Sequence, residues 1–279
     1  MVKGLKFWKM HSLGNDYILI DNMDNKLATD LNNLARRLCE RRYSVGADGL
    51  ILACKSDVAD VKMRIFNADG SEAEMCGNGI RCLTKFCYEN GIIRQKSFDV
   101  ETLAGIKRVW IIDIENDEVK TVRVNMGKPI FDRPLIPMVG EGKCIDEVLE
   151  VNGEVYKVTC LSVGNPHCII FTNDVSSIPI DRIGPKIENH KIFPKRTNVE
   201  FVQVINSGEI KVRVWERGVG ETLACGTGAC ASVVASYILG KTDKKVKVRL
   251  AGGSLEVVYA GDEILMDGPA TKVFAGELF

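Results

Sequence analysis

The amino-acid sequence predicts a mixed α/β (α+β) fold of two pseudo-symmetric domains that arose by internal duplication. Each domain is expected to be a curved, mostly antiparallel sheet or barrel around one central helix, with the active site in the cleft between the domains. Three observations predict this fold. The chain repeats a segment at a fixed offset, short β-branched and aromatic segments dominate it, and each repeat ends in Cys-Gly-polar-Gly directly before a helix-like stretch.

The repeat is the strongest of these observations. Residues 61–79 align with residues 210–228 in one register, at an offset of 149 positions (210 − 61). Near the start of each half, Ser-Leu-Gly-Asn at 12–15 aligns with Ser-Val-Gly-Asn at 162–165. Since each half carries one cysteine at a glycine-rich helix start, the duplication predicts two thiols that face each other across a cleft.

The strands are predicted from short runs of β-branched and aromatic residues. In the first half these runs are residues 5–8, 17–21, 50–53, 61–66, 97–101, 109–114 and 119–124. In the second half they are residues 155–162, 167–171, 198–205, 209–216, 245–250, 254–259 and 263–266.

Three helices are predicted. Residues 30–40 have apolar residues at helical spacing. Residues 78–88 and 227–239 each follow a cysteine and are closed by Gly91 and Gly240, because glycine is common just past a helix end. The last of these helices is apolar nearly all round, which is typical of a buried helix.

The duplication also predicts the domain boundaries. Residues 1–126 are expected to form the N-terminal half, joined by the C-terminal tail 270–279, and residues 127–269 are expected to form the C-terminal half. The segment 125–137 is rich in glycine and proline, so it is the expected crossing between the halves.

Composition excludes several function classes. Thirty-seven Lys and Arg residues balance 37 Asp and Glu residues, so no excess charge indicates a nucleic-acid or membrane partner. With 46% hydrophobic residues, the 279-residue chain can bury a substantial core. The first residues lack the apolar core of a signal peptide, and no apolar run approaches the roughly 20 residues of a membrane helix. A cytoplasmic location is expected.

Ten cysteines are many for such a chain. Without an export signal, a disulfide framework is not expected, because the cytosol keeps thiols reduced. No metal is expected either, since structural zinc sites usually show two closely spaced cysteine pairs. Eight cysteines lie in apolar settings and are expected to be small core residues; they are Cys39, Cys54, Cys82, Cys87, Cys144, Cys160, Cys168 and Cys230.

Cys76 and Cys225 differ from these eight, because each stands directly before a glycine-rich helix start. Unpaired N–H groups and the helix dipole there are expected to lower the pKa of a thiol. The neighbouring glycines would let a substrate carboxylate reach the same N–H groups. One thiolate could then remove an α-proton while the other thiol protonates the opposite face, without any cofactor. The expected donors to the developing charge are Gly77, Asn78, Gly226 and Thr227.

Eight motifs occur in order along both halves. They are His-Ser-Leu-Gly-Asn-Asp-Tyr at 11–17, Gly-Ala-Asp-Gly at 46–49, Phe-Asn-Ala-Asp-Gly-Ser at 66–71, Met-Cys-Gly-Asn-Gly-Ile-Arg at 75–81, Gly-Asn-Pro-His at 164–167, Arg-Thr-Asn-Val-Glu at 196–200, Trp-Glu-Arg-Gly at 215–218 and Ala-Cys-Gly-Thr-Gly at 224–228. With these motifs the chain resembles the diaminopimelate epimerase family over nearly its whole length.

The resemblance implies the interconversion of LL- and meso-diaminopimelate without cofactor or metal, on the route to lysine and peptidoglycan. It implies that Cys76 and Cys225 are the acid/base pair, by convention donor and acceptor, and that His167 and Glu216 tune activity. The residues implied to bind the substrate's carboxylates and amines are Asn15, Asn67, Gly77, Asn78, Asn165, Asn198, Glu216, Arg217, Gly226 and Thr227.

Two further positions follow from the resemblance. Some family members have glutamine where this chain has Gly49, so at most a weak substrate contact is implied there. Phe274 aligns weakly with an aromatic dimer contact, and a homodimer is implied. The distal carboxylate of a symmetric diamino diacid suits a bidentate grip by Arg217, and a carboxylate such as Glu216 suits an ammonium group.

Other interpretations stay open. A proline or hydroxyproline racemase of the same fold typically has histidine where this chain has Asn78, and phenazine-type isomerases lack the cysteine pair. A thiol redox or metal-binding protein would contain zinc or a redox pair close in sequence. A non-catalytic binding module would tolerate the loss of both thiols. The structural alternatives are turn residues for Asn15 and Asn165, a core histidine for His167, a surface arginine for Arg217, and loop charges for Glu72 and Glu221.

Overall fold

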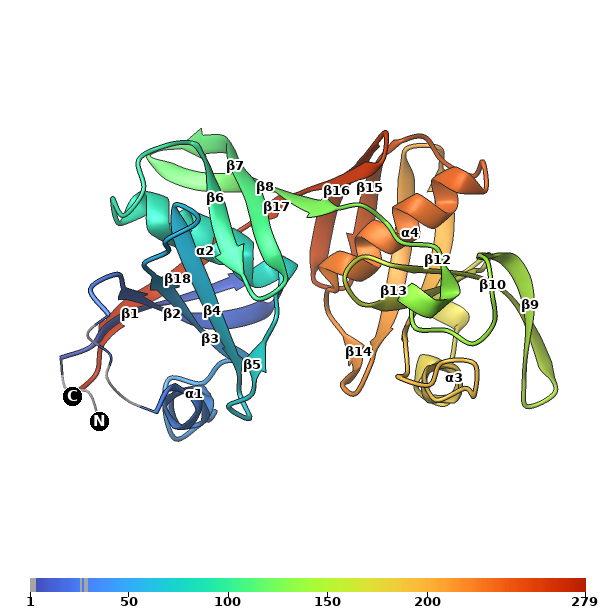
Figure 1. Ribbon diagram of the computed structural model, residues 1–279, viewed down its shortest axis with the longest axis horizontal. Helices are drawn as coiled ribbons and strands as arrows, with labels where there is room; N and C mark the ends of the chain where they lie inside the picture. The colour runs from blue at the N-terminus through green and yellow to red at the C-terminus, as the bar shows by residue number, and fades with distance from the viewer. Residues whose placement is uncertain (1–3, 26, 28–29) are drawn as a thin grey trace. The chain divides into compact units, whose positions relative to one another are not determined.

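The computed structural model describes residues 4–25, 27 and 30–279. The chain divides into two compact units (Figure 1). Unit 1 comprises Met1–Asn125 together with Asp267–Phe279, and unit 2 comprises Met126–Met266. Among the described residues, each unit has many strands and two α-helices.

Unit 1 is built on a chain of paired strands. Neighbouring strands pair in the order β18, β1, β2, β3, β4, β6, β7 and β8. The pairs β2–β3 and β4–β6 are parallel, and the other pairs are antiparallel. The short β5 pairs with β4. The bounds are β1 (Lys6–Ser12), β2 (Asn15–Asn22), β3 (Gly49–Cys54), β4 (Val61–Asn67), β5 (Glu72–Ala73), β6 (Ser97–Thr102), β7 (Gly105–Glu115), β8 (Glu118–Gly127) and β18 (Thr271–Glu277).

Unit 2 repeats this pairing order. Its strands pair in the order β9, β10, β11, β12, β13, β15 and β16. The pairs β11–β12 and β13–β15 are parallel, and the other pairs are antiparallel. β14 pairs with β13 as β5 does with β4. The bounds are β9 (Cys144–Val151), β10 (Glu154–Ser162), β11 (Pro166–Phe171), β12 (Asn198–Asn206), β13 (Glu209–Glu216), β14 (Gly220–Thr222), β15 (Lys245–Leu250) and β16 (Gly253–Ala260). β17 (Glu263–Pro269) begins in unit 2 and ends in unit 1.

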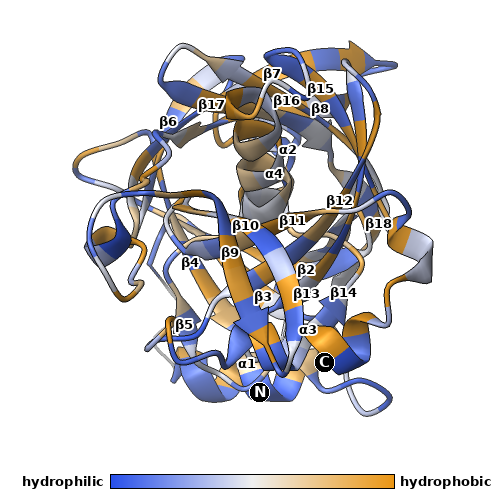
Figure 2. Ribbon diagram, turned by 90° about the vertical axis from the view of Figure 1, so that its right-hand side faces the viewer, coloured by the Kyte–Doolittle hydropathy of each residue, from blue (hydrophilic) through white to orange (hydrophobic). Residues whose placement is uncertain are grey.

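Each unit wraps its strands around one long helix. In unit 1, α2 (Gly77–Glu89) contacts β1, β2, β3, β4 and β7 (Figure 1). In unit 2, α4 (Gly226–Ile238) contacts strands β10 to β13, β15 and β16. Almost every residue of α4 up to Ser236 is buried, so the prediction of a buried helix is confirmed. Bands of blue and orange along the strands show the alternation expected of sheets with one face on a core (Figure 2).

The second helix of each unit lies against the sheet. α1 (Leu31–Cys39) is capped by Asp30, whose side chain accepts a hydrogen bond from the Asn33 N–H. α3 (Ile180–Glu188) was not predicted, because Gly184 and Pro185 interrupt its pattern. Gly184 is required by packing, since a Cβ there would lie 2.5 Å from the Trp215 ring.

Four strands were also not predicted, namely β5, β9, β14 and β18. Within the expected crossing 125–137, β8 extends to Gly127 and a 3-10 turn spans Arg133–Leu135. The eight cysteines expected in the core are all buried, which confirms that prediction.

Candidate active site

Cys76 and Cys225 occupy equivalent positions in the two units, immediately before α2 and α4. Both have extended backbone and stand at the helix N-cap. The Cys225 sulfur accepts a hydrogen bond from the Gly228 N–H at 3.3 Å and lies 3.4 Å from the Thr227 hydroxyl. The Cys76 side chain makes no such cap and contacts residues of β2 instead. Each thiol therefore has its own set of partners.

The partners of Cys76 are neutral hydrogen-bonding groups. Its half-buried sulfur lies 2.9 Å from the Tyr17 hydroxyl and 3.8 Å from Asn15 Oδ1. The Tyr17 hydroxyl donates to Asn15 Oδ1, and Asn78 Nδ2 donates to the same oxygen at 3.2 Å. Burial, first, and then the adjacent Cys76 raise the pKa of Tyr17 well above its usual value, so this residue is a neutral phenol.

A fully buried arginine orients this group. Arg81 donates to the Gly77 carbonyl at 2.9 Å, to Asn78 Oδ1 at 2.6 Å and to the Ser12 hydroxyl at 2.6 Å. Since Asn78 Oδ1 accepts from Arg81, its Nδ2 is directed to Asn15. Arg81 was not predicted as a site residue and was named only as part of a motif, because nothing in the sequence pattern indicated that its charge would be buried.

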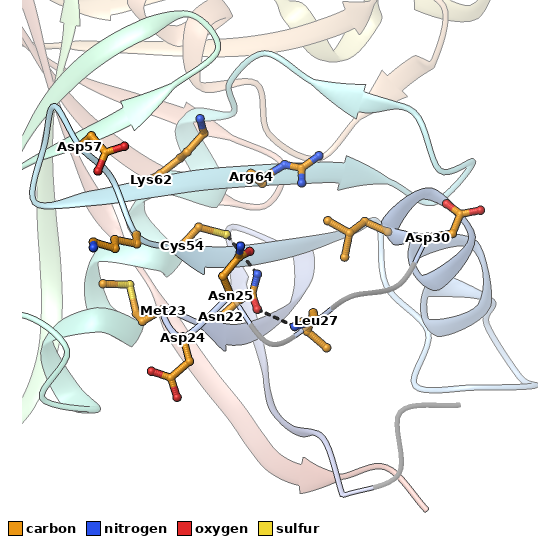
Figure 3. A pocket seen from close by; sticks show the side chains of 12 residues that line it. Asn22, Met23, Asp24, Asn25, Leu27, Asp30, Cys54, Asp57, Lys62 and Arg64 are labelled. Atoms are coloured by element: carbon orange, nitrogen blue, oxygen red, sulfur yellow. Dashed lines mark hydrogen bonds between the residues drawn. The ribbon is translucent and has the colours of Figure 1, made fainter.

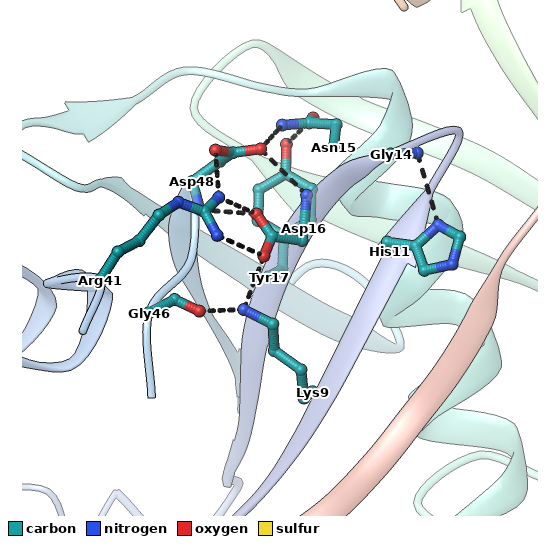
Figure 4. A network of polar contacts seen from close by, with 9 residues as sticks. All are labelled: Lys9, His11, Gly14, Asn15, Asp16, Tyr17, Arg41, Gly46 and Asp48. Atoms are coloured by element: carbon teal, nitrogen blue, oxygen red, sulfur yellow. Dashed lines mark hydrogen bonds and ion pairs between the residues drawn. The ribbon is translucent and has the colours of Figure 1, made fainter. Parts of the chain in front are cut away.

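Asn15 is also tied to an ionic network outside the helix start (Figure 4). Its Nδ2 donates to Asp48 Oδ2 at 2.8 Å, and Arg41 binds both Asp48 and Asp16. Burial opposes ionisation of Asp16, but hydrogen bonds from Arg41 and Lys9 lower its pKa to about 2. Asn15 is therefore held by side-chain contacts and is more than a turn residue.

The surroundings of Cys225 carry charge. Burial, followed by the carboxylates of Glu216 and Glu200, raises the pKa of the Cys225 thiol well above its usual value. The expectation of a lowered pKa is wrong for Cys225 in this structure. The Thr227 hydroxyl and the Gly228 N–H do favour the thiolate, but desolvation and two negative charges outweigh them.

A buried His–Glu pair stands behind this thiol. His167 Nδ1 lies 2.7 Å from Glu200 Oε1, and His167 Nε2 lies 2.8 Å from Asn165 Oδ1. Both His167 and Glu200 are fully buried, and in the described part of the chain Glu200 Oε2 has no hydrogen-bond partner. His167 thus has the partners of a satisfied core histidine and also contacts a predicted site residue. Glu200 was not predicted as a site residue.

Glu216 ends β13 beside this pair. Burial raises its pKa, although a hydrogen bond from the Thr222 hydroxyl acts in the opposite direction. The next residue, Arg217, donates its backbone N–H to Asn198 Oδ1 at 2.9 Å, and Asn198 Nδ2 donates to the Pro166 carbonyl. The Arg217 guanidinium has one hydrogen-bond partner among the described residues, the Lys195 carbonyl at 3.2 Å. Its charge is not neutralised by any carboxylate there.

The remaining predicted residues lie at the start of α4 and on strands of unit 1. Gly226 begins α4. Gly49 pairs with Tyr17 on one side and with Asn67 on the other. The Asn67 side chain donates to the Ser71 hydroxyl within its own turn. Phe274 lies apart from these residues on β18 and packs edge-on against Phe7.

The loops before the two cysteines carry matching ion pairs. Arg64 Nε donates to Glu72 at 2.7 Å, and Arg213 Nε donates to Glu221 at 2.7 Å. Both arginines use a second nitrogen as well, so each contact is bidentate. Glu72 and Glu221 therefore join the short strand before each cysteine to the neighbouring long strand.

A pocket of about 1000 Å³ in unit 1 is lined by none of the predicted site residues (Figure 3). Two of the three cations that line it are paired, Lys62 with Glu101 and Arg64 with Glu72. In the described ranges, no group of three or more His, Cys, Asp and Glu side chains is placed to hold a metal ion. Of the helices described, none has the length and apolar character that crossing a bilayer requires.

Some known proteins resemble this chain in sequence, and others resemble it in fold. A family model described as diaminopimelate epimerase matches residues 7–131 and 159–273. The diaminopimelate epimerase of Moorella thermoacetica is 51% identical over 276 residues, covering 98% of this chain and 99% of the relative. That of Methanococcus maripaludis is 49% identical over 277 residues, covering 98% and 99%.

Solved structures with lower identity share the fold. A phenazine biosynthesis protein from Bacillus anthracis has a TM-score of 0.73 at 18% identity, with all of both chains covered. A probable proline racemase from Agrobacterium radiobacter has a TM-score of 0.72 at 16% identity, covering 99% of this chain and 93% of that one. Together with the repeated strand order, these likenesses confirm the predicted mixed α/β fold with two pseudo-symmetric halves.

Proposed function

This chain belongs to the diaminopimelate epimerase family, and we propose that it interconverts LL- and meso-diaminopimelate with Cys76 and Cys225 as the two acid/base groups. The observation that carries the proposal is the equivalent position of the two cysteines, each at the N-cap of the central helix of its unit. Racemase relatives at 16% identity share only the fold, whereas diaminopimelate epimerases are about half identical over nearly the whole chain.

The proposed reaction is a proton exchange at one carbon. One thiolate removes the α-proton, and the electron pair left on the carbon spreads into the adjacent carboxylate. The other thiol donates its proton to the opposite face, so the stereocentre inverts and the two sulfur atoms exchange protonation states. The reaction requires that both thiols reach the same carbon. Donors at the start of each helix stabilise the carboxylate as it gains charge, and we assign them to Gly77, Asn78, Gly226 and Thr227.

Recognition of the substrate's second amino acid centre distinguishes this reaction from proline racemisation. We assign the distal carboxylate to Arg217, since no carboxylate of the described chain neutralises its guanidinium. We assign an ammonium group to Glu216, whose carboxylate stands at the end of β13. The other side chains proposed to contact substrate are Asn15, Asn67, Asn165 and Asn198, with Gly49 at most a weak backbone contact.

Proton NMR in D2O tests the proposed function. Purified, reduced protein with LL-diaminopimelate and no pyridoxal phosphate is expected to lose the α-proton signal while meso product appears, and L-proline is expected to stay unexchanged. Exchange of proline alone would keep the chemistry and change the substrate. No exchange of either compound would contradict the proposal.

We also propose a cytoplasmic homodimer with Phe274 at its interface. Phe274 is 46% exposed on β18, which pairs antiparallel with β1. Sedimentation of the native chain is expected to give a dimer, and Phe274→Glu is expected to give monomer. A native monomer would exclude the proposed interface.

A further inference from the structure

The two units place different residues at one equivalent strand position. β2 and β3 pair in parallel with Tyr17 opposite Gly49, and β11 and β12 pair in the same way with His167 opposite Asn198. Both Tyr17 and His167 also follow an asparagine by two residues. Tyr17 therefore stands in unit 1 where His167 stands in unit 2.

Both residues bind the preceding asparagine. The Tyr17 hydroxyl donates to Asn15 Oδ1, and His167 Nε2 lies 2.8 Å from Asn165 Oδ1. The phenol has a further contact, because its oxygen lies 2.9 Å from the Cys76 sulfur. Tyr17 is thus in direct contact with a sulfur that the proposed reaction uses.

The backbone around Tyr17 leaves room for this ring. A Cβ on Gly49 would lie 2.7 Å from the Phe66 carbonyl and 3.2 Å from the Tyr17 ring. Any larger residue there would have to displace the backbone of β4 or the ring itself. Tyr17 is only 5% exposed, so its hydroxyl is held in place by packing.

We propose that Tyr17 is a positioning residue for Cys76, with a hydroxyl that accepts a hydrogen bond from the thiol in one half of the catalytic cycle and donates one to the thiolate in the other. This rests on the proposed function, in which Cys76 must serve as acid in one direction and as base in the other.

A hydroxyl suits both states, because it has one donor and two acceptor lone pairs. With Cys76 as thiol, the S–H donates to the Tyr17 oxygen while the Tyr17 O–H donates to Asn15 Oδ1. With Cys76 as thiolate, the Tyr17 O–H rotates to the sulfur, and Asn15 Oδ1 keeps the hydrogen bond from Asn78. No proton leaves Tyr17 in either state, and no bond other than a hydrogen bond is exchanged.

Other groups around Cys76 do not replace this contact. From α2, Arg81 reaches Asn78 and the Gly77 carbonyl, and the Cys82 thiol is fully buried. From the turn before β3, the Asp48 carboxylate accepts hydrogen bonds from the Asn15 side chain, the Asp16 N–H and Arg41. Among the described residues, Tyr17 is the ionisable side chain with a hydrogen bond to the Cys76 sulfur.

Tyr17→Phe tests the proposal, because it removes one oxygen and keeps the ring. Tyr156→Phe is the matched control, since its hydroxyl binds Glu154 on β10. In the free protein we expect the pH at half-maximal alkylation of Cys76 by iodoacetamide to rise by about one unit in Tyr17→Phe, and to stay unchanged in the control. Trypsin releases residues 65–81, in which Cys76 is the one cysteine, so mass spectrometry reads this thiol alone.

Activity gives the second readout. Loss of a hydrogen bond to a charged sulfur is expected to lower kcat/KM roughly 10-fold. The loss must be equal in both directions, because a variant cannot change the equilibrium between the two isomers. Unshifted alkylation in Tyr17→Phe would overturn the proposal, even if activity fell through a loss of stability.

The alkylation needs no substrate, so it separates this inference from the proposed function. If the wild-type protein did not exchange the α-proton, the proposed function would be overturned. The alkylation shift would still show whether the Tyr17 hydroxyl hydrogen-bonds to the Cys76 sulfur. If Tyr17→Phe did not fold, the infrared difference between wild type and Cys76→Ala would isolate the Cys76 S–H stretch. A band at the frequency of a free thiol would then overturn the contact, and a band at lower frequency would support it.

Discussion

Glu200 and Gly228 are in contact so close that no side chain fits between them: a Cβ on Gly228 would lie 2.6 Å from Glu200 Oε1. Gly228 is the third residue of α4 and its N–H donates to the Cys225 sulfur. The same carboxylate holds His167 at 2.7 Å. Because Gly228 has no side chain, the Glu200 carboxylate can lie close to the start of α4 while it also contacts the His167 imidazole.

Gly228→Ala is the first prediction. The new methyl group must displace Glu200 or the start of α4, and overpacking of this kind costs about 1–3 kcal/mol. We expect a lower melting temperature and at least a roughly 10-fold loss of kcat/KM, because the displacement reaches the Cys225 sulfur. Gly208→Ala is the control, since its Cβ would meet nothing closer than 3.6 Å. Normal activity in Gly228→Ala would show that Glu200 moves freely.

Glu200→Gln is the second prediction. Glu200 is one of the two carboxylates that raise the pKa of Cys225, so removal of its charge is expected to shift alkylation of Cys225 to lower pH. Glu221→Gln makes the same charge change at an exposed carboxylate paired with Arg213, and is expected to cause no shift. A shift to higher pH in Glu200→Gln would contradict this account of the Cys225 environment.

The third prediction concerns Arg217. Loss of a bidentate carboxylate contact is expected to reduce kcat/KM roughly 100-fold in Arg217→Met, mainly through a higher KM. Arg217→Lys keeps the charge but loses the planar fork, so an intermediate loss is expected. Arg249→Met removes a surface arginine that pairs with Glu209, and should leave both constants unchanged. An unaltered KM in Arg217→Met would contradict the assignment of the distal carboxylate.

The fourth prediction is a pH dependence of stability. The pKa of Asp16 is about 2 in the folded protein against an ordinary 3.8, so this carboxylate stabilises the fold fully above pH 4. The contribution is lost as the pH falls from about 4 to 2, and after allowance for partial exposure it amounts to about 1 kcal/mol. Asp16→Asn should be less stable than wild type at pH 6, and this difference should shrink at pH 2. A difference that did not depend on pH would contradict this account.

The sequence predicted the repeated core well, because the duplication and the apolar character of α4 are local properties of the chain. It did not predict α3, where Gly184 and Pro185 break the helical pattern but Gly184 fits the Trp215 ring. Nor did it predict β18, which pairs with β1, far away in sequence. Long-range pairing of this kind leaves little local signal.

The same limit applies to the site. Cysteine, asparagine and glycine motifs identified the residues around both helix starts. Glu200 and Tyr17 were not singled out, although the repeat register pairs Tyr17 with His167. The pKa of Cys225 depends on burial and on two carboxylates from other strands, so the local rule for a helix N-terminus gave the wrong direction.

The central claim is that two thiols act on opposite faces of one carbon, and the position of the first deuterium tests it most directly. LL-diaminopimelate is incubated with the protein in D2O to a few per cent conversion, and both isomers are recovered for mass spectrometry. The account predicts deuterium at the α-carbon of the meso product while the recovered LL-isomer is still protonated, because one sulfur removes the proton and the other delivers solvent deuterium. Equal deuterium in both isomers from the outset would indicate a single base and contradict the account.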